Sequence, residues 1–365
     1  MKITAIRAIP VRVPRPQPFT SSLGLQAGSE NAVVVVETDG GVTGIGEISS
    51  IWDRKGRGQA EDVNDLLAEA LVGMDPFAPN RVADRMDELL HRSYPAKAGV
   101  EMALYDIMGK ALDVPVYDLL GGRRRERVAL SRSLSMGDAE AAVAQAEAAA
   151  AQGYRTLKLK VGRDAESDCR TLAALRRALG DGFTLRVDAN MGWPSAKEAV
   201  RRIRRLEEFD LELVEQPLAA DDLEGLRFVR ERVETPIMAD ESVWTPADAM
   251  ACVRAGAVDV FNVYVAEAGG LGAASRVFAV AEAARLPGII GSMPELGIGT
   301  AAQAHLAFAV PALGYACDLN GFTYHSDDIA RHDLRLEDGY IYPPPGPGLG
   351  VELDTERLER YRIDR

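Results

Sequence analysis

The fold is decided by a stretch in which Lys158-Leu159-Lys160 is followed by Val187-Asp188-Ala189-Asn190, Val214-Glu215-Gln216-Pro217 and Ala239-Asp240-Glu241-Ser242. Each segment ends a short apolar run and precedes a helical pattern, and the three acidic segments stand 27 and 25 residues apart. Such an alternation of strand and helix is typical of a parallel sheet. The carboxyl ends of parallel strands meet at one edge, so we expect the three carboxylates to lie close together.

The same alternation extends over residues 126–325. The predicted strands end at residues 160, 188, 215, 240, 264, 292 and 318, and the last of them is Tyr315–Asp318. A strand–helix unit repeated at this step, with crossovers of one hand, most economically closes into a TIM-type barrel of the α/β class. An open doubly wound sheet is the alternative, although no Gly-rich dinucleotide turn follows its first strand.

Residues 1–125 have a different pattern. The first 37 residues alternate as strands do, and Asp39-Gly40-Gly41 is a hairpin signal before a returning strand at Val42–Glu47. Helical patterns follow at about 59–72, 80–92 and 97–112. Strands followed by helices predict a small α+β unit, with a boundary near Gly121-Gly122-Arg123.

Composition narrows the class of protein. The net charge of −13 over 365 residues argues against nucleic acid and anionic membranes as partners. The chain has no run of about 18 apolar residues, and its start lacks the apolar stretch of a signal peptide. Three widely spaced cysteines fit a reducing compartment. We therefore expect a cytoplasmic protein.

The three carboxylates, Asp188, Glu215 and Asp240, predict a metal site. Packed together they repel one another unless a cation lies among them. Oxygen ligands without Cys or His favour Mg²⁺, or Mn²⁺, over zinc. The alternative is three unrelated acids that form salt bridges at the strand ends.

Lys158 and Lys160 lie two residues apart on one strand, so both point to the same side. Two neighbouring ammonium groups disfavour each other's charge, which moves one lysine toward a basic neutral form. Alternatively, both are structural counter-ions for Asp188 and Glu215.

Together, the Lys-x-Lys, Asp-x-Asn, Glu-Gln-Pro and Asp-Glu-Ser signatures resemble the enolase superfamily, specifically its muconate-lactonizing-enzyme subgroup. Val116–Gly122 and Pro347–Val351 also look like segments of that subgroup, so the resemblance spans nearly the whole chain. It implies an N-terminal α+β capping domain (1–125), closed by the C-terminal segment 326–365. It also implies a modified TIM barrel, (β/α)7β, over residues 126–325.

The resemblance further implies a reaction. Mg²⁺ on Asp188, Glu215 and Asp240 would bind the carboxylate of a small substrate. The proton α to that carboxylate would then be removed to give a metal-stabilised enediolate. Lys160 would act as base or acid, with Lys158 as its electrostatic partner. The α-proton is so weakly acidic that the developing charge must be stabilised as it forms.

The chain departs from the family at the end of the sixth strand. There the family has Asn-x-Lys-x-x-Lys-x-Gly-Gly, whereas this chain reads Asn262-Val263-Tyr264-Val265-Ala266-Glu267-Ala268-Gly269-Gly270. Tyr264 takes the place of the second acid/base lysine. The family also has an alternative to this lysine, a histidine on the seventh strand, but Gly291–Glu295 contains no histidine. His325 follows the eighth strand and could reach the site.

Three interpretations of Tyr264 remain open. In the first, Lys160 alone moves the proton in a muconate-cycloisomerase-like cycloisomerase or a β-elimination (dehydratase), and Tyr264 orients or stabilises. In the second, Lys160 and Tyr264 form a two-base racemase or epimerase of an amino-acid derivative, since a phenol has a pKa of about 10, close to that of lysine. In the third, the protein binds a metal or ligand without turnover.

Substrate contacts are expected from both domains. Phe19 and Trp52, in capping loops at about 16–30 and 49–56, would shield the site from water or simply anchor the loops. Asp318 would hold a substrate amine or hydroxyl, or pair with Arg132 or Lys158. The remaining candidates are Asn320, which breaks an Asp-x-Asp pair, Asn190, and Glu295, the last also a possible partner for Tyr264. We also expect a homo-oligomer.

Overall fold

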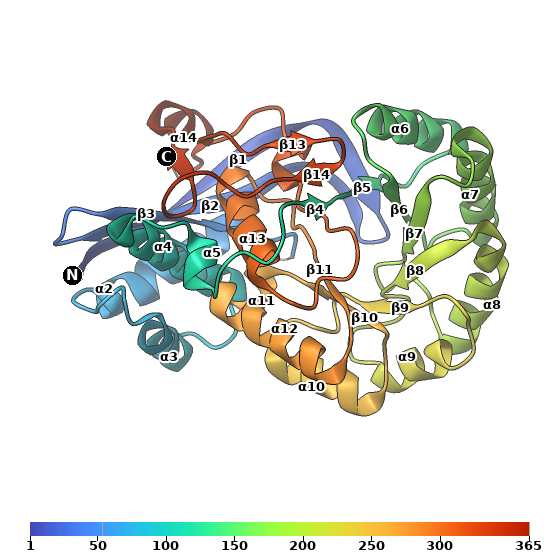
Figure 1. The fold of residues 1–365 in the computed structure, drawn as a ribbon, viewed down its shortest axis with the longest axis horizontal. Helices are drawn as coiled ribbons and strands as arrows, with labels where there is room; N and C mark the ends of the chain where they lie inside the picture. Colours follow the sequence, from blue (N-terminus) through green and yellow to red (C-terminus); the bar gives the residue numbers. More distant parts are fainter. Residues whose placement is uncertain (53, 365) are drawn as a thin grey trace.

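The computed structural model describes residues 1–52 and 54–364, which form a capping domain beside a barrel (Figure 1). The capping domain has a three-stranded antiparallel sheet in the order β1-β2-β3. Its strands are β1 (Ile3–Ser21), β2 (Gly24–Thr38) and β3 (Thr43–Ile48). Beside them lie α1 (Gly56–Asp62), the π-helical turn η1 (Val63–Leu67), α2 (Ala68–Leu71), α3 (Pro79–Leu89), α4 (Tyr94–Leu112) and α5 (Val116–Leu119). The predicted hairpin and the three predicted helical regions are confirmed.

Helix α4 packs directly on β3, and two glycines make this contact possible. A Cβ atom at Gly44 would lie 2.1 Å from the carbonyl oxygen of Ala103, and one at Gly46 would lie 2.0 Å from that of Gly99. Any side chain at either glycine would therefore push the helix away from the sheet. The close contact buries α4 on nearly every side.

The barrel sheet has seven parallel strands in chain order. They are β5 (Ser131–Leu134), β6 (Thr156–Lys160), β7 (Thr184–Asp188), β8 (Leu211–Glu215), β9 (Ile237–Ala239), β10 (Val260–Val263) and β11 (Gly288–Ile290). Helices follow the strands: α6 (Ala139–Ala151), α7 (Ala165–Leu179), α8 (Ala196–Leu206) with η2 (Glu207–Phe209), α9 (Leu223–Arg230), α10 (Pro246–Ala255), α11 (Val265–Ala268), α12 (Leu271–Ala284) and α13 (Gly297–Ala309). The modified TIM barrel is thereby confirmed.

Side-chain caps fix the start of several barrel helices. Ser195 accepts a hydrogen bond from the Glu198 N–H at the start of α8, and Thr245 forms a capping box with Asp248 at the start of α10. These caps satisfy N–H groups that have no partner within the helix. They also fix the point at which each preceding loop ends.

The predicted eighth strand, Tyr315–Asp318, was wrong in detail. Within the described residues this segment makes single bridging contacts and no strand ladder. The Ser131 N–H donates to the Cys317 carbonyl at 2.8 Å, and the Asp318 N–H donates to the Ile290 carbonyl at 2.9 Å. The segment therefore closes the gap between β5 and β11, but it turns into η3 (Gly321–Tyr324) before a ladder can form.

The C-terminal part of the chain returns to the capping domain. It contains β12 (Ala330–His332), β13 (Leu336–Glu337), β14 (Tyr340–Ile341), β15 (Val351–Leu353) and α14 (Thr355–Tyr361), while β4 (Val128–Ala129) pairs with β14. Beyond α14, the Ile363 N–H donates to the Pro10 carbonyl at 3.0 Å. Across residues 1–52 and 54–364, no helix has both the length and the apolar character needed to cross a bilayer.

Candidate active site

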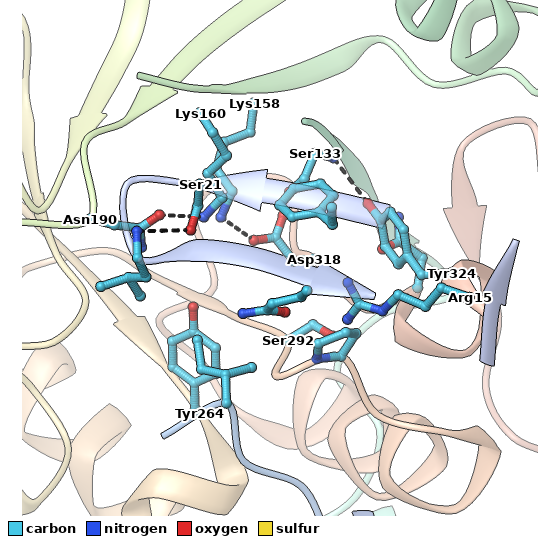
Figure 2. A pocket seen from close by; sticks show the side chains of 16 residues that line it. Arg15, Ser21, Ser133, Lys158, Lys160, Asn190, Tyr264, Ser292, Asp318 and Tyr324 are labelled. Atoms are coloured by element: carbon cyan, nitrogen blue, oxygen red, sulfur yellow. Dashed lines mark hydrogen bonds and ion pairs between the residues drawn. The ribbon is translucent and has the colours of Figure 1, made fainter. Parts of the chain in front are cut away.

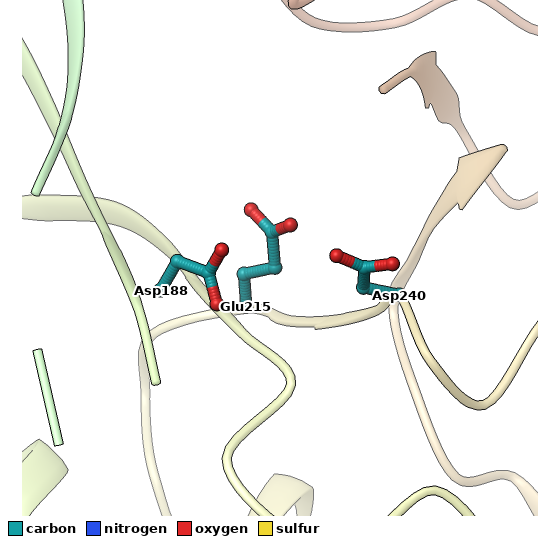
Figure 3. A group of neighbouring side chains, drawn as sticks. All are labelled: Asp188, Glu215 and Asp240. Atoms are coloured by element: carbon teal, nitrogen blue, oxygen red, sulfur yellow. The ribbon is translucent and has the colours of Figure 1, made fainter. Parts of the chain in front are cut away.

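Three carboxylates converge at the carboxyl edge of the barrel sheet (Figure 3). Asp188 ends β7, Glu215 ends β8 and Asp240 follows β9. Each offers one oxygen, and these oxygens all lie within 4.8 Å of one another. The strand register aligns Asp188 with Glu215, so the pairing of the strands sets the spacing. The predicted convergence of this carboxylate triad is confirmed.

The electrostatics of the triad fit a divalent cation. Burial raises the pKa of Glu215 well above its usual range, and the neighbouring Asp188 carboxylate raises it further. The pKa of Asp240 is also raised well above its usual range by burial, and Glu241 and Glu267 add to the shift. Three buried carboxylate donors this close together are a suitable ligand set for a hard cation such as Mg²⁺ or Mn²⁺.

Two lysines of β6 form ion pairs with triad carboxylates and point into the pocket near Asn190 and Asp318 (Figure 2). Lys158 is buried and forms ion pairs with Asp318 at 2.5 Å and with Glu215 at 3.0 Å. Lys160 forms an ion pair with Asp188, donates to Asn190 Oδ1 at 3.0 Å, and keeps 13% of its side chain exposed. Lys160 is therefore the more accessible lysine of the two.

The expected lowering of a lysine pKa was wrong for the structure without a bound cation. Burial has the largest single effect and lowers the pKa of Lys160, and Lys158 also lowers it. The Asp188 and Glu215 carboxylates together outweigh both, so the net shift of the pKa is upward. A cation bound to Asp188 would reduce this effect of the carboxylate on Lys160.

Tyr264 follows β10 and connects to the triad by hydrogen bonds. Its hydroxyl donates to Asp240 Oδ2 at 3.0 Å and accepts from Asn262 Nδ2 at 3.1 Å. Asn262 Nδ2 also lies 2.9 Å from Glu215 Oε1. Burial raises the pKa of Tyr264 well above 10, and the Asp240 carboxylate raises it further. Tyr264 is thus a protonated donor to a triad carboxylate.

A pocket with an empty volume of about 610 Å³ opens over these groups. Five predicted site residues from the barrel line it: Lys158, Lys160, Asn190, Tyr264 and Asp318, together with Asn320 from the loop that follows. Phe19 lines it from the capping domain, where its ring packs edge-on against Tyr324.

The β1–β2 hairpin is docked on the barrel at the end of β7. Ser22 Oγ lies 2.9 Å from the carbonyl oxygens of both Ala189 and Asn190. Arg163 donates to the Ser21 carbonyl at 3.1 Å. These contacts hold the hairpin as one wall of the pocket, next to Asn190, which accepts a hydrogen bond from Lys160.

The carboxylate of Asp318 is occupied by other residues of this chain. Besides its ion pair with Lys158, it accepts a hydrogen bond from Ser131 Oγ. Of the two partners considered for it, Lys158 is therefore the one found. Asn320 donates to the Ser131 carbonyl at 2.8 Å and to the Tyr154 hydroxyl at 3.2 Å.

Trp52 and Glu295 do not line the pocket. Trp52 Nε1 donates to Glu267 Oε1 at 2.6 Å and its ring packs on Trp244, so it anchors its loop. Glu295 accepts hydrogen bonds from Ser292 and from Gln303, and within residues 1–52 and 54–364 it forms no hydrogen bond with Tyr264.

The largest omission from the sequence predictions is Arg15, which lines the pocket and is only 9% exposed. A signal for it exists, because Val11, Val13 and Arg15 occupy alternate positions of β1 and all three are buried. His325, in contrast, is buried but does not line the pocket.

Comparison with known proteins identifies the family. Residues 3–121 match the model for the mandelate racemase / muconate lactonizing enzyme N-terminal domain, and residues 141–357 match the enolase C-terminal domain-like model. Among the relatives is the N-succinyl-L-Arg/Lys racemase of Bacillus cereus, 30% identical over 100% of this chain and 98% of its own length. The crystal structure of that racemase superposes with a TM-score of 0.95.

Two further relatives differ in their reactions. The hydrophobic dipeptide epimerase of Enterococcus faecalis is 36% identical over 96% of this chain and 95% of its own. A muconate lactonizing enzyme from Pseudomonas fluorescens, complexed with muconolactone, has a TM-score of 0.96 and 31% identity over 99% of each chain. An enzyme is therefore indicated, and the interpretation as a non-catalytic binding protein is not retained. The chain belongs to the mandelate racemase/muconate lactonizing enzyme family and is an isomerase of the enolase superfamily.

Proposed function

We propose that this enzyme removes the proton α to the carboxylate of a small substrate and that Lys160 alone transfers the proton, as in a cycloisomerisation. One observation carries the proposal. Lys160 lines the pocket beside the triad, whereas the Tyr264 hydroxyl donates to Asp240. A hydroxyl bound to a carboxylate in this way positions that carboxylate and remains protonated.

The residues around Lys160 orient its amine. Asp188 and Asn190 both accept from Nζ, which limits the directions in which the amine can point. Lys158 places a buried positive charge close by, where negative charge develops on the substrate carboxylate as the proton leaves. Asp188, Glu215 and Asp240 would hold Mg²⁺ or Mn²⁺, which supplies further positive charge to that carboxylate when bound.

The pocket also limits access of water to the reacting carbon. Phe19, Leu23, Ile51 and Pro294 all line it. A pocket with apolar walls strengthens the electrostatic interactions between its charged groups and the substrate.

A two-base racemase or epimerase is the second candidate, because Tyr264 lies across the pocket from Lys160 in Figure 2. Two relatives catalyse reactions of this kind. This candidate requires Tyr264 to give up its proton, which its burial and its bond to Asp240 oppose.

The test measures exchange of the substrate α-proton in D₂O by ¹H NMR. The compounds are amino acids, N-acyl amino acids, muconates, lactones and hydroxy acids, each chiral compound as both enantiomers, with Mg²⁺ present. Lys160→Met should lower the exchange rate at least ~10³-fold, within the range for loss of a general acid/base. Lys197→Met, an exposed position on α8, is the matched control.

Undiminished exchange by Lys160→Met would show that the proposal is wrong. If Tyr264→Phe loses exchange with one enantiomer only, the two-base reaction is correct. If it retains exchange with both enantiomers, Tyr264 is not a base.

A further inference from the structure

A second pocket, with an empty volume of about 660 Å³, lies next to the main pocket. Its walls come from the β1–β2 hairpin, the loop after β5 and the start of α7, and they include Thr20, Met136, Arg163, Asp164, Ser167 and Asp168. Arg163 and Asp164 are exposed, so the second pocket opens to solvent. Lys160 is the one described residue that lines both pockets. The lysine of the proposed reaction can therefore be reached from two sides.

The end of strand β1 forms the wall between the two pockets. Phe19 and Ser21 line the main pocket, whereas Thr20, which lies between them, lines the second pocket. Neighbouring residues of a strand point to opposite faces, which explains this division. The wall is held in place, because the Met136 N–H donates to the Thr20 carbonyl at 2.9 Å and Arg163 donates to the Ser21 carbonyl at 3.1 Å. A substrate that fills the main pocket would therefore leave the second pocket open.

The proposed reaction needs such a second opening. The C–H bond at the α-carbon breaks, its electron pair stays with the substrate, and the proton forms an N–H bond on Lys160. In the ring-opening direction, that electron pair becomes a double bond and the ring oxygen leaves with the electrons of its C–O bond. The proton then remains on Lys160 and must pass to solvent before the next turnover. In the ring-closing direction, solvent must supply the proton instead.

Asp168 is a buried titratable side chain in the wall of the second pocket, and it is 8% exposed. It accepts a hydrogen bond from the Gly162 N–H at 3.3 Å, and no basic side chain of residues 1–52 and 54–364 forms an ion pair with it. Arg202, which interacts with it electrostatically, is paired with Glu198 at 2.8 Å. Burial raises the pKa of Asp168 to about 6, so this carboxyl can take up and release a proton near neutral pH.

We propose that the second pocket is the route by which protons pass between Lys160 and solvent, and that Asp168 relays them. This inference rests on the proposed function, since Lys160 must be the group that takes the substrate proton. The second pocket is large enough for several water molecules, each of which occupies about 30 Å³. The Lys160 ammonium gives its proton to such water, the Asp168 carboxylate accepts it, and the carboxyl then releases it at the pocket mouth. Asp168 thus returns Lys160 to its basic form without touching the substrate.

The first test follows α-proton exchange in D₂O, in dilute buffer, with the compound of the proposed-function panel that exchanges fastest. Asp168→Asn keeps an acceptor for the Gly162 N–H but cannot carry the proton, so exchange should fall roughly 100-fold, the lower end of the range for loss of a proton-transfer group. Added imidazole, which enters the second pocket and carries the proton itself, should restore exchange. A role of Asp168 in folding alone would not give this rescue.

A variant that fills the second pocket is the counterpart of this rescue. Ser167→Trp places a large ring in the pocket wall, so it should slow exchange, and imidazole should not restore the rate. Arg170→Trp is the matched control, because Arg170 is exposed on the same helix and lines neither pocket. It should leave exchange unchanged.

The second test needs no substrate. The thiol of Lys160→Cys is labelled with methyl methanethiosulfonate, and mass spectrometry follows the peptide that carries position 160. Leu23→Trp narrows the main pocket, which that residue lines. Adding Ser167→Trp should then slow labelling at least ~10-fold further, because the reaction of a thiol depends on access to it. Adding Arg170→Trp in its place should not slow labelling.

The outcomes separate this inference from the proposed function. Labelling that Ser167→Trp does not slow would overturn the inference, since the second pocket would not lead to position 160. Undiminished exchange in Asp168→Asn, or a loss that imidazole does not restore, would overturn the relay. Exchange that depends on Lys160 but on neither Asp168 nor Ser167 supports the proposed function and refutes the inference. If no compound exchanges, the proposed function and the relay are both refuted, and labelling alone decides whether the second pocket reaches position 160.

Discussion

Replacing Tyr264 by Phe separates two roles that a phenol can have in this pocket. The change removes one oxygen and keeps the ring. It deletes the 3.0 Å hydrogen bond to Asp240 and the 3.1 Å bond from Asn262. If the hydroxyl positions Asp240, its loss should weaken binding of the metal. If it transfers a proton, its loss should slow turnover even when metal is saturating.

The magnitude follows from the kind of bond that is lost. A hydrogen bond to a charged, buried carboxylate contributes about 1.5–3 kcal/mol, which corresponds to roughly 10- to 100-fold in an equilibrium constant. The same range is typical for loss of a residue that orients a metal ligand. We therefore expect Tyr264→Phe to raise the Kd for Mn²⁺ about 10- to 100-fold.

The assay is Mn²⁺ titration followed by electron paramagnetic resonance, with proton exchange measured at saturating metal. Tyr154→Phe is the control, because that buried hydroxyl accepts a hydrogen bond from Asn320 and, among the residues that the structure describes, forms none with the triad. An unchanged Kd for Mn²⁺ together with a loss of exchange of about 10³-fold or more would refute the positioning role and identify Tyr264 as a proton-transfer group.

Three further predictions concern the metal, the effect of acid, and the contact of the capping domain with the C-terminal segment. Chelation should abolish activity and lower Tm, and Mg²⁺ or Mn²⁺ should restore both, because a ligand that binds only the folded state stabilises it; an unaffected activity in the chelated enzyme would contradict the metal site. Burial lowers the pKa of His305 from 6.5 to about 4, so as the pH falls this imidazole is protonated in the unfolded chain before it is protonated in the folded protein. About 3 kcal/mol of folding stability that is present above pH 6.5 should therefore be lost as the pH falls toward 4. Urea unfolding of wild type and His305→Gln should show this pH dependence only in wild type, and equal slopes would contradict it. Asp106→Asn should cost about 1–3 kcal/mol in urea unfolding, because the buried carboxylate accepts from Ile45, Leu349 and Lys110, whereas the exposed Asp113→Asn should change little.

The alternation of strands and helices allowed the barrel and the triad to be predicted from the sequence. Side chains at the ends of adjacent parallel strands must meet at one edge, so Asp188, Glu215 and Asp240 follow from spacing alone. The same reasoning gave a wrong prediction for the segment Tyr315–Asp318, which forms no strand ladder. It has the composition of a strand, but whether a ladder forms depends on how far β5 and β11 extend beside it.

Contacts between the domains could not be predicted, because they join residues distant in sequence. Trp52 donates a hydrogen bond to Glu267, which lies 215 positions later in the chain. Nothing in the sequence around either residue predicts that the two side chains meet. The raised pKa of Lys160 has the same origin, since it depends on the balance of all charges around the amine. Arg15 was missed because sequence position alone does not show that an inward position of an edge strand opens onto a pocket.

The docked hairpin has a consequence for how such an enzyme changes its substrate. The barrel carries the ion pairs and the triad, while Arg15 and Phe19 come from β1 of another domain and Leu23 from the turn that follows β1. Mutations in the hairpin can therefore redesign the cavity without disturbing the ligand set. Ser22 limits this independence, because its contacts with Ala189 and Asn190 fix the height of the hairpin above β7. Directed evolution of this scaffold would begin on either side of Ser22 and keep the serine itself.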